Sequence, residues 1–184
     1  MIDPVPLIVD LDGTLIDGDT LHLSLWRILR ERAWVAPLLP FAVFAGRARF
    51  KSFVSEHVTL EPASLPYRAD VIAFVKGERP VRRQLMLATA AHRSIAESVA
   101  SYLGLFDTVI ATDAQHNAKG NGKLVSIRAT IGDLPFDYIG DSVNDVPVFR
   151  AARRSYLVCP TAALASAVRD GCRVHAVFDA PRRG

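Results

Sequence analysis

Leu7-Ile8-Val9-Asp10-Leu11-Asp12-Gly13-Thr14-Leu15 is the stretch of sequence that decides the fold. Its first three residues are apolar and two of them are β-branched, which predicts a buried strand. Positions i and i+2 of a strand share a face, so Asp10 and Asp12 start on the same side. Two close carboxylates repel each other and are costly to bury unless a cation or a proton lies between them. The stretch therefore predicts a site for a metal ion, a shared proton or both, although Asp12-Gly13 alone is also typical of a turn.

Length and composition predict one globular domain. The chain has 184 residues, of which 50% are hydrophobic and 22% charged, so it can bury a sizeable core. It has no apolar run long enough for a membrane span and no evident secretory signal. Its two cysteines, Cys159 and Cys172, have no metal-type spacing, so we expect free thiols and a cytoplasmic location. The net charge of +3 comes without a dense basic stripe, which argues against nucleic acid and suits a small anionic substrate.

Apolar runs alternate with helical patterns along the chain. We expect strands at 7–11, 84–88, 106–111, 136–139, 155–158 and 174–178. We expect helices at 67–76, 93–103, 122–131, 146–152 and 162–168, and at least two more within 20–58, where Pro37 and Pro40 interrupt the pattern. This alternation predicts an α/β fold built on a doubly wound parallel sheet, whose ligands bind beyond the carboxyl ends of the strands.

Polar side chains follow the ends of several of these expected strands. They are Asp10, Asp12, Thr89, Asp141 and Asp145. Because the carboxyl ends of parallel strands meet at one edge of a sheet, we expect these side chains to converge. Four carboxylates in one crevice would repel each other without a hard divalent cation. Oxygen ligands without a Cys or His partner favour Mg²⁺ over zinc, so the sequence predicts a magnesium site.

A phosphate site is expected beside the metal. The turn after Thr89 and the helix after Asp141 would present backbone N–H groups that suit a phosphate. Lys119 or Lys123 could reach in as a fixed positive charge. Each of these residues alone has an ordinary interpretation, as a helix cap, a turn residue or a surface lysine. Their joint placement after alternate strands favours the phosphate site.

Four motifs occur in one order: D-x-D-G-T at 10–14, a threonine after an apolar strand, a lysine, and G-D-x-x-x-D at 140–145. This order resembles the haloacid dehalogenase superfamily, over residues 5 to about 178. The resemblance implies a Rossmann-like core in which Asp10 is a nucleophile that forms an aspartyl-phosphate, and Asp12 is the general acid and then the base. Dehalogenating members lack the second aspartate, so the resemblance favours hydrolysis of a phosphate monoester. The alternatives are a phosphotransferase or mutase of the same superfamily, and a non-catalytic module that binds a phosphorylated ligand.

The resemblance also implies roles for the other polar residues. Mg²⁺ would be held by Asp10, the backbone carbonyl of Asp12, and Asp141, with Asp145 as a ligand or an orienter. The phosphate would be held by Thr89, Ala90 and Lys123, and Lys123 matches the family better than Lys119. Support would come from Thr14, Ser142 and Asn144. His92 departs from the family pattern, which often has a small polar residue there, and is a candidate contact for a small phosphorylated substrate.

Residues 17–80 separate the first motif from the second, where this superfamily carries a helical cap. The resemblance therefore implies a small helical cap at 17–80, inserted into a core domain made of 1–16 and 81–184. Within it, the apolar stretch 33–45 is interpreted as the cap's own core, or as part of a surface at 33–51 for a membrane or a lipid-linked phosphate. The basic residues of that surface would be Arg47, Arg49 and Lys51.

A narrower resemblance concerns the cap and the segment Leu87–His92. Both look like the phosphatase-like domain that is fused ahead of polyprenyl-transferring membrane enzymes. This resemblance implies a sugar phosphate or a polyprenyl-linked phosphosugar as substrate and a location at the membrane periphery. It leaves open whether the chain stands alone or is one domain of a longer protein, and the oligomeric state is not readable from the sequence.

Overall fold

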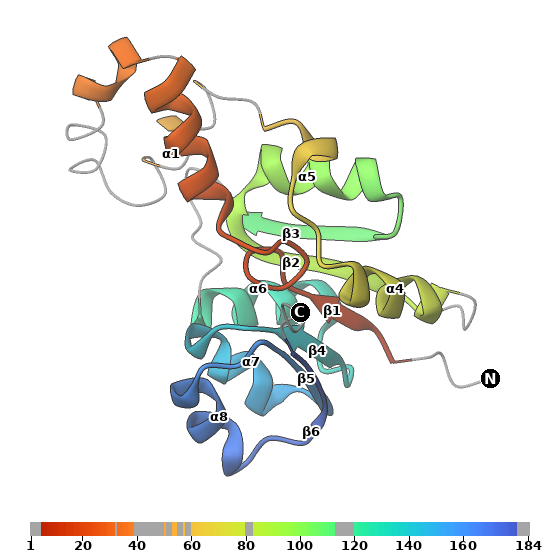
Figure 1. Ribbon diagram of the computed structural model, residues 1–184. Helices are drawn as coiled ribbons and strands as arrows, with labels where there is room; N and C mark the ends of the chain where they lie inside the picture. The colour runs from red at the N-terminus through yellow and green to blue at the C-terminus, as the bar shows by residue number, and fades with distance from the viewer. Residues whose placement is uncertain are drawn as a thin grey trace.

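A parallel sheet of six strands forms the centre of the protein. A computed structural model describes residues 5–31, 33–38, 50, 53–54, 57, 60–79, 83–112 and 120–179. The strands are β1 (Leu7–Val9), β2 (Leu85–His92), β3 (Thr108–Thr112), β4 (Asp137–Gly140), β5 (Arg154–Val158) and β6 (Val174–Phe178). They lie in the order β3-β2-β1-β4-β5-β6, and every neighbouring pair is parallel (Figure 1). The expected doubly wound parallel sheet is confirmed.

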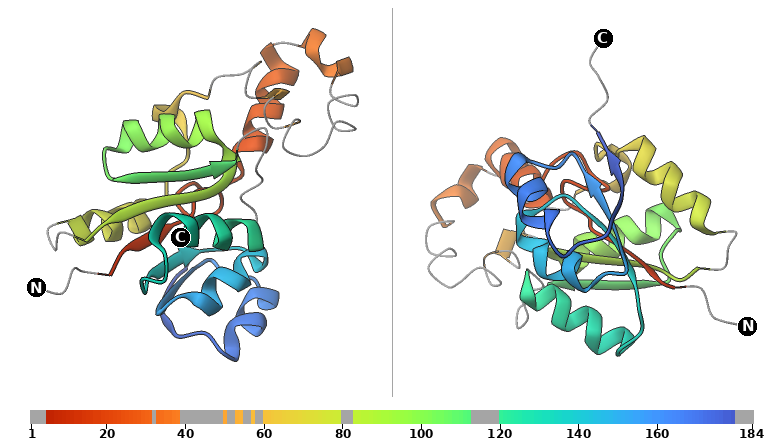
Figure 2. Two further views of the ribbon diagram at one scale, coloured as in Figure 1. Left: turned by 180° about the vertical axis from the view of Figure 1, so that it is seen from behind. Right: turned by 90° about the horizontal axis from the view of Figure 1, so that it is seen from below.

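Helices cover both faces of this sheet. They are α4 (Ala69–Glu78), α5 (Arg93–Leu103), α6 (Asn121–Ile131), α7 (Val146–Ala151) and α8 (Ala162–Arg169), whereas α1 (Thr20–Glu31) lies apart from the sheet (Figure 2). Alternation along β1 sends Leu7 and Val9 into one hydrophobic cluster, together with apolar residues of α4 and α5. It sends Ile8 into a second cluster on the other face, with α6, α7 and α8. The β1 strand is therefore buried on both sides, as its unbroken apolar sequence predicts.

The winding of the chain reverses at β1. This strand pairs with β2 on one side and with β4 on the other, and the later strands continue outward from each neighbour. In a sheet with this order, the crevice beyond the carboxyl ends of the central strands is where ligands bind. Asp10 directly follows β1 and so lies at that crevice.

The second strand is longer than the sequence predicted. We expected a strand at 84–88 with Thr89 just beyond it, but β2 continues to His92. Pairing with β3 is irregular after Ala88 and resumes between His92 and Thr112, which extends the strand. Thr89 therefore lies inside β2, and the turn expected directly after it is wrong.

Two other element boundaries shift for local reasons. The helix expected from Tyr67 begins at Ala69, because Tyr67 forms an antiparallel bridge with Ile16. The strand expected from Phe106 begins at Thr108, because the Asp107 carboxylate accepts a hydrogen bond from the Leu85 amide and pairs with Arg79. In both places a specific contact outweighs the apolar pattern of the sequence.

The range expected to form the cap contains more than one kind of structure. Helix α1 begins after Asp19, whose side chain accepts hydrogen bonds from the Leu21 and His22 amides, and it projects away from the sheet (Figure 2). Short 3₁₀ helices follow at η1 (Ala33–Leu38), which contains Pro37, and at η2 (Pro62–Ser64). Helix α4 instead packs on the core sheet, where the Phe74 ring lies 5.0 Å from Tyr156 and 5.3 Å from Phe178 between centroids.

Most of the surface expected at 33–51 falls outside the described residues, including Arg47, Arg49 and Lys51. Within the described part, Trp34 is exposed and Val35 is buried. Among the helices that the structure describes, none is both long enough and apolar enough to cross a membrane.

Candidate active site

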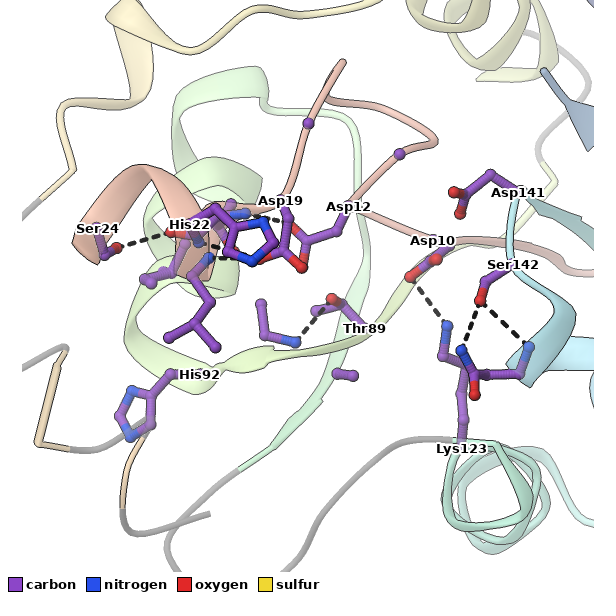
Figure 3. A pocket seen from close by; sticks show the side chains of 18 of the residues that line it. Asp10, Asp12, Asp19, His22, Ser24, Thr89, His92, Lys123, Asp141 and Ser142 are labelled. Atoms are coloured by element: carbon purple, nitrogen blue, oxygen red, sulfur yellow. Dashed lines mark hydrogen bonds and ion pairs between the residues drawn. The ribbon is translucent and has the colours of Figure 1, made fainter. Parts of the chain in front are cut away.

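A cavity of about 750 Å³ opens at the carboxyl edge of the sheet, between the central strands and the start of α1 (Figure 3). Residues from the first motif, from β2, from α6 and from the loop after β4 line it together. The lining includes Asp10, Asp12, Thr89, Ala90, Lys123, Asp141, Ser142, Asn144 and Asp145. The convergence expected from the sequence is therefore present in the structure.

Asp10 and Asp12 occupy different surroundings although they are two residues apart. The Asp10 amide continues the sheet by donating to the Ile139 carbonyl at 3.0 Å, and the Asp10 side chain is buried. The Asp12 carboxylate accepts a hydrogen bond of 2.7 Å from the Thr20 amide, at the first turn of α1. Helix N-termini favour negative charge. The first carboxylate thus belongs to the core, and the second is anchored to the start of α1.

The turn after these aspartates brings Asp141 against the chain. Gly13 has φ +74°, and a Cβ placed there would lie 2.0 Å from Asp141 Oδ2. Thr14 Oγ1 donates to Asp141 Oδ1 at 3.3 Å. Arg68, at the start of α4, donates to the Gly13 carbonyl at 3.2 Å and pairs with Asp17 at 2.6 Å. Gly13 is therefore required both for its backbone conformation and for the close approach of Asp141.

Lys123 forms the electrostatic centre of the cavity. Its Nζ lies 2.9 Å from Asp10 Oδ1, 2.9 Å from Asp145 Oδ2 and 3.0 Å from the Tyr138 hydroxyl. The side chain is 3% exposed, so these contacts are shielded from water. Lys119, the alternative lysine, lies outside the described residues.

Burial shifts the titration of these groups. Burial raises the pKa of Asp10 to about 8, and the charges of Asp145 and Asp141 add to this, while Lys123 opposes it. Burial and the charge of Asp145 also raise the pKa of Asp141. Burial alone would lower the pKa of Lys123, but Asp10 and Asp145 outweigh it and raise that pKa. Without a further cation, the cavity thus favours a proton on Asp10 and Asp141 and keeps the lysine charged.

The residues expected to bind phosphate line the cavity from β2 and from the loop after β4. Thr89 is fully buried, and its Oγ1 accepts a hydrogen bond of 3.0 Å from the Ala91 amide. Ser142 Oγ accepts from the Asn144 side-chain amide at 2.9 Å and from the Asn144 backbone amide at 3.2 Å. These hydrogen bonds lie within the β2 segment and within the loop after β4. The polar groups expected to bind a phosphate therefore line the open cavity.

The residues that line the cavity fit a divalent cation. Among the described lining residues, five aspartates (Asp10, Asp12, Asp19, Asp141 and Asp145) face a single Lys or Arg side chain, that of Lys123. The carboxylate oxygens are hard donors of the kind Mg²⁺ prefers. Among the described residues, no three His, Cys, Asp or Glu side chains form a ready-made cage. Mg²⁺ in proteins is commonly held by one or two carboxylates with waters and substrate phosphate, so this arrangement remains compatible with it.

The sequence interpretation missed Tyr138. This residue of β4 is fully buried, and its hydroxyl donates to Asp145 Oδ2 at 2.8 Å. Burial and the charges of Asp145 and Asp10 raise the pKa of Tyr138 well above its ordinary value, so the phenol keeps its proton. A cue was present, because a tyrosine inside a buried strand needs a polar partner.

Comparisons with known proteins bear on the family and the fold of this chain. The family model described as haloacid dehalogenase-like hydrolase matches residues 7–150. The uncharacterized protein y4nM of Sinorhizobium fredii is 35% identical over 155 residues, which are 84% of this chain and 30% of the relative, so the chain spans about a third of that protein's length.

Two solved structures share the fold. A protein of unknown function from Bordetella pertussis Tohama I has a TM-score of 0.71 at 19% identity, covering 94% of this chain and 98% of its own. Phosphoserine phosphatase in its apo form has a TM-score of 0.65 at 13% identity, covering 97% and 94%. The match to the family model spans most of the sequence and all the motif residues of the site. The chain therefore belongs to the haloacid dehalogenase-like hydrolase family.

Proposed function

We propose that this protein is a Mg²⁺-dependent phosphatase that hydrolyses a phosphate monoester through a covalent intermediate on Asp10. The observation that carries the proposal is the contact of 2.9 Å between the buried Lys123 ammonium and Asp10 Oδ1, in a cavity lined by three further motif carboxylates. A fixed cation beside a buried carboxylate offsets the repulsion that an incoming phosphate dianion would meet. The alternative, that these residues form only a turn and an ion pair with a structural role, would not require an open cavity beside them.

In the first step, an Asp10 carboxylate oxygen attacks phosphorus while the bond from phosphorus to the leaving oxygen breaks. Asp12, entering this step as the carboxylic acid, gives its proton to that oxygen, and the product alcohol departs. Lys123, the Thr89 hydroxyl and the backbone N–H groups near Ala90 stabilise the phosphoryl oxygens. The Thr20 amide holds the Asp12 carboxylate at 2.7 Å on the cap side of the cavity, where a leaving group would lie.

In the second step, Asp12 works as a base. Its carboxylate takes a proton from water, the water oxygen attacks phosphorus, and the bond to the Asp10 oxygen breaks. Inorganic phosphate leaves and Asp10 returns as a carboxylate. Mg²⁺ held by Asp10, the Asp12 carbonyl and Asp141, with Asp145 nearby, would supply positive charge that lowers the repulsion between the phosphate and Asp10. Thr14 orients Asp141 through its hydrogen bond.

The apolar wall of the cavity favours a substrate with an apolar portion. It includes Leu21, Phe50, Val54 and Ile95, with His22 and His92 among its polar members. We propose a small phosphorylated substrate whose leaving group packs on this wall, with sugar phosphates and polyprenyl-linked phosphosugars as the candidates. Comparing kcat/KM for phosphoserine, a hexose phosphate and an isoprenyl phosphate tests this choice.

We also propose that the cap is the part of 17–80 that precedes α4. The contacts of Phe74 with Tyr156 and Phe178 support placing α4 with the core domain. The membrane surface at 33–51 stays a prediction, and co-sedimentation with anionic liposomes tests it. No binding, together with full activity on lipid-free phosphates, would argue against that surface.

Hydrolysis of p-nitrophenyl phosphate tests the activity itself. Wild-type protein is measured with Mg²⁺ and with EDTA, beside Asp10→Asn and the matched surface variant Asp133→Asn. We expect Asp10→Asn to lose about a thousandfold or more in kcat, and Asp133→Asn, whose side chain is exposed, to behave as wild type. Full activity in Asp10→Asn would overturn the nucleophile assignment. Transfer of the phosphoryl group to an added alcohol in preference to water would favour the phosphotransferase alternative.

A further inference from the structure

Tyr138 lies two residues before Gly140, the end of β4, yet its hydroxyl reaches the cavity residues at the carboxyl edge of the sheet. Tyr138 pairs with Ile8 and Ser155 in the middle of the sheet, whereas β4 ends at Gly140. A Cβ at Gly140 would lie 2.8 Å from Tyr138 Cε1 and 3.1 Å from its hydroxyl oxygen. The ring therefore lies along the strand over Gly140, which has no side chain to obstruct it.

Packing holds the ring in this direction. The Tyr138 ring makes an edge-on contact with Phe149 of α7, at 4.9 Å between centroids and 74° between planes. The side chain is fully buried, so its rotamer is set by neighbours on all sides. The hydroxyl is thus presented to the cavity residues by the core and not by a surface loop.

Three acceptors surround the Lys123 ammonium. They are Asp10 Oδ1, Asp145 Oδ2 and the Tyr138 hydroxyl, all within 3.0 Å of Nζ. An ammonium has three N–H donors, so these contacts match its full capacity. The tyrosine is the neutral member of the set, and its own proton goes to Asp145 Oδ2 at 2.8 Å. Lys123, Tyr138 and Asp145 therefore form a closed triangle of hydrogen bonds.

We propose that Tyr138 is a positioning residue for the reaction, whose hydroxyl holds the Lys123 ammonium against Asp10 and fixes the orientation of Asp145. When a phosphate enters the cavity, the Lys123 ammonium exchanges one of its contacts for a phosphoryl oxygen. Its hydrogen bond to the Tyr138 hydroxyl keeps the ammonium in place during this exchange. Asp145 Oδ2 stays bound to Tyr138, which would orient this carboxylate as a ligand or neighbour of a bound Mg²⁺. The inference rests on the proposed phosphatase function and adds a residue to its machinery.

The test compares Tyr138→Phe with Tyr156→Phe. Both changes remove one hydroxyl from a tyrosine in the inner part of the sheet, but Tyr156 packs on the opposite face, against Phe74 and His175. We expect Tyr138→Phe to lower kcat about tenfold or more and to weaken calorimetric Mg²⁺ binding several-fold, as outer-shell partners commonly do. We expect KM to change less than kcat, because positioning of Lys123 matters most in the transition state. Tyr156→Phe should match wild type in all three quantities.

The outcomes separate this inference from the proposed function. A Tyr138→Phe protein that keeps wild-type kcat, or a Tyr156→Phe protein with an equal loss, overturns the positioning role. If wild-type protein hydrolyses no phosphate monoester, the proposed function fails, and the calorimetric comparison alone decides on Tyr138. Unchanged Mg²⁺ affinity in Tyr138→Phe then rejects the inference, and selective weakening supports it.

Discussion

At the residue scale, the buried ammonium of Lys123 balances only part of the negative charge around it. Asp10 and Asp145 both contact it, while Asp141 lies close to the turn at Gly13. Low local dielectric makes each of these charges interact more strongly than at a surface. The position of single atoms, such as the missing Cβ of Gly13, therefore decides whether the carboxylates can be arranged around a cation.

Gly13→Ala should abolish Mg²⁺ binding. Its free energy of unfolding should fall by only a little more than that of a matched glycine variant. The new methyl group would collide with the Asp141 carboxylate, which must then turn away. Gly104→Ala is the control, because Gly104 also has positive φ (+61°) but has no atom within 4 Å of an added Cβ. Both variants should lose about 1 kcal/mol from backbone strain. Calorimetry with Mg²⁺ and thermal melting check this, and normal Mg²⁺ affinity in Gly13→Ala would contradict it.

At the element scale, the two ends of β4 do different work. Its carboxyl end leads to Asp141 and the cavity, while its first residue, Asp137, is buried at the opposite edge of the sheet. Arg153 donates to both Asp137 oxygens at 3.0 and 2.9 Å, and Arg83 pairs with the same carboxylate. Arg83 also donates to the Val5 carbonyl at 2.6 Å. This cluster ties the chain before β1, the approach to β2 and the start of β4 into one unit.

Asp137→Asn should destabilise the fold without changing the chemistry. Removing the carboxylate leaves the buried Arg83 with Glu78 as its remaining ion-pair partner and breaks its pair with Asp137, which costs about 3 kcal/mol. Urea unfolding measures this loss, and kcat of the folded enzyme should stay at the wild-type value because the cluster lies away from the cavity. Asp133→Asn, at an exposed site, is the control with no expected loss. A large fall in kcat for folded Asp137→Asn would contradict the division between the two ends.

The same cluster predicts a loss of stability in acid. Burial would raise the pKa of Asp137, but the hydrogen bonds from Arg153 and the charge of Arg83 outweigh it and hold the pKa below its ordinary value. A lowered pKa in the folded state stabilises the protein above the unfolded-state pKa, near about 4. This stabilisation is lost as pH falls through the folded-state pKa, and Asp137→Asn should lack it.

At the scale of the whole molecule, two hydrophobic clusters hold the sheet from both faces, while the carboxyl edge gathers like charges. Burial of Asp10 and Asp141 raises their pKa values in the folded protein. A raised pKa contributes stability below the unfolded-state pKa, and that contribution is lost as pH rises through the folded-state pKa. The charge repulsion at the carboxyl edge of the sheet therefore grows with pH. The packing of the two hydrophobic clusters stabilises the fold against this repulsion.

Mg²⁺ should stabilise the protein more at high pH than at low pH. Protons held by Asp10 and Asp141 compete with the metal, so the increase in melting temperature on adding saturating Mg²⁺ should be larger at pH 8.5 than at pH 6, on either side of the Asp10 pKa of about 8. Differential scanning calorimetry with and without the metal measures the increase. Asp10→Asn should show a smaller dependence on pH. An increase that is equal at both pH values would contradict the assignment of buried, metal-binding carboxylates.

Much of the fold follows from local patterns. The unbroken apolar run 7–9 predicts a buried parallel strand, because both of its faces must be covered by helices. The motif residues Asp10, Asp141 and Asp145 could be placed at one edge, because parallel strands end together. Thr89 was placed wrongly relative to its strand, since the irregular pairing of β2 with β3 is a contact between segments far apart in sequence. Tyr138 was missed for a similar reason, because its partners Lys123 and Asp145 come from α6 and from the loop after β4.

The amino-acid sequence by itself determined the doubly wound sheet, the edge at which its polar residues gather and the family to which the chain belongs. Each of these depends on spacing and residue type along the chain, which local sterics and burial convert directly into structure. Only the tertiary structure decided that Lys123 contacts Asp10 and Asp145, that Gly13 leaves room for Asp141, and that Tyr138 reaches the site over Gly140. These depend on distances of a few ångströms between separate elements, and such distances are set by the packing of the whole core.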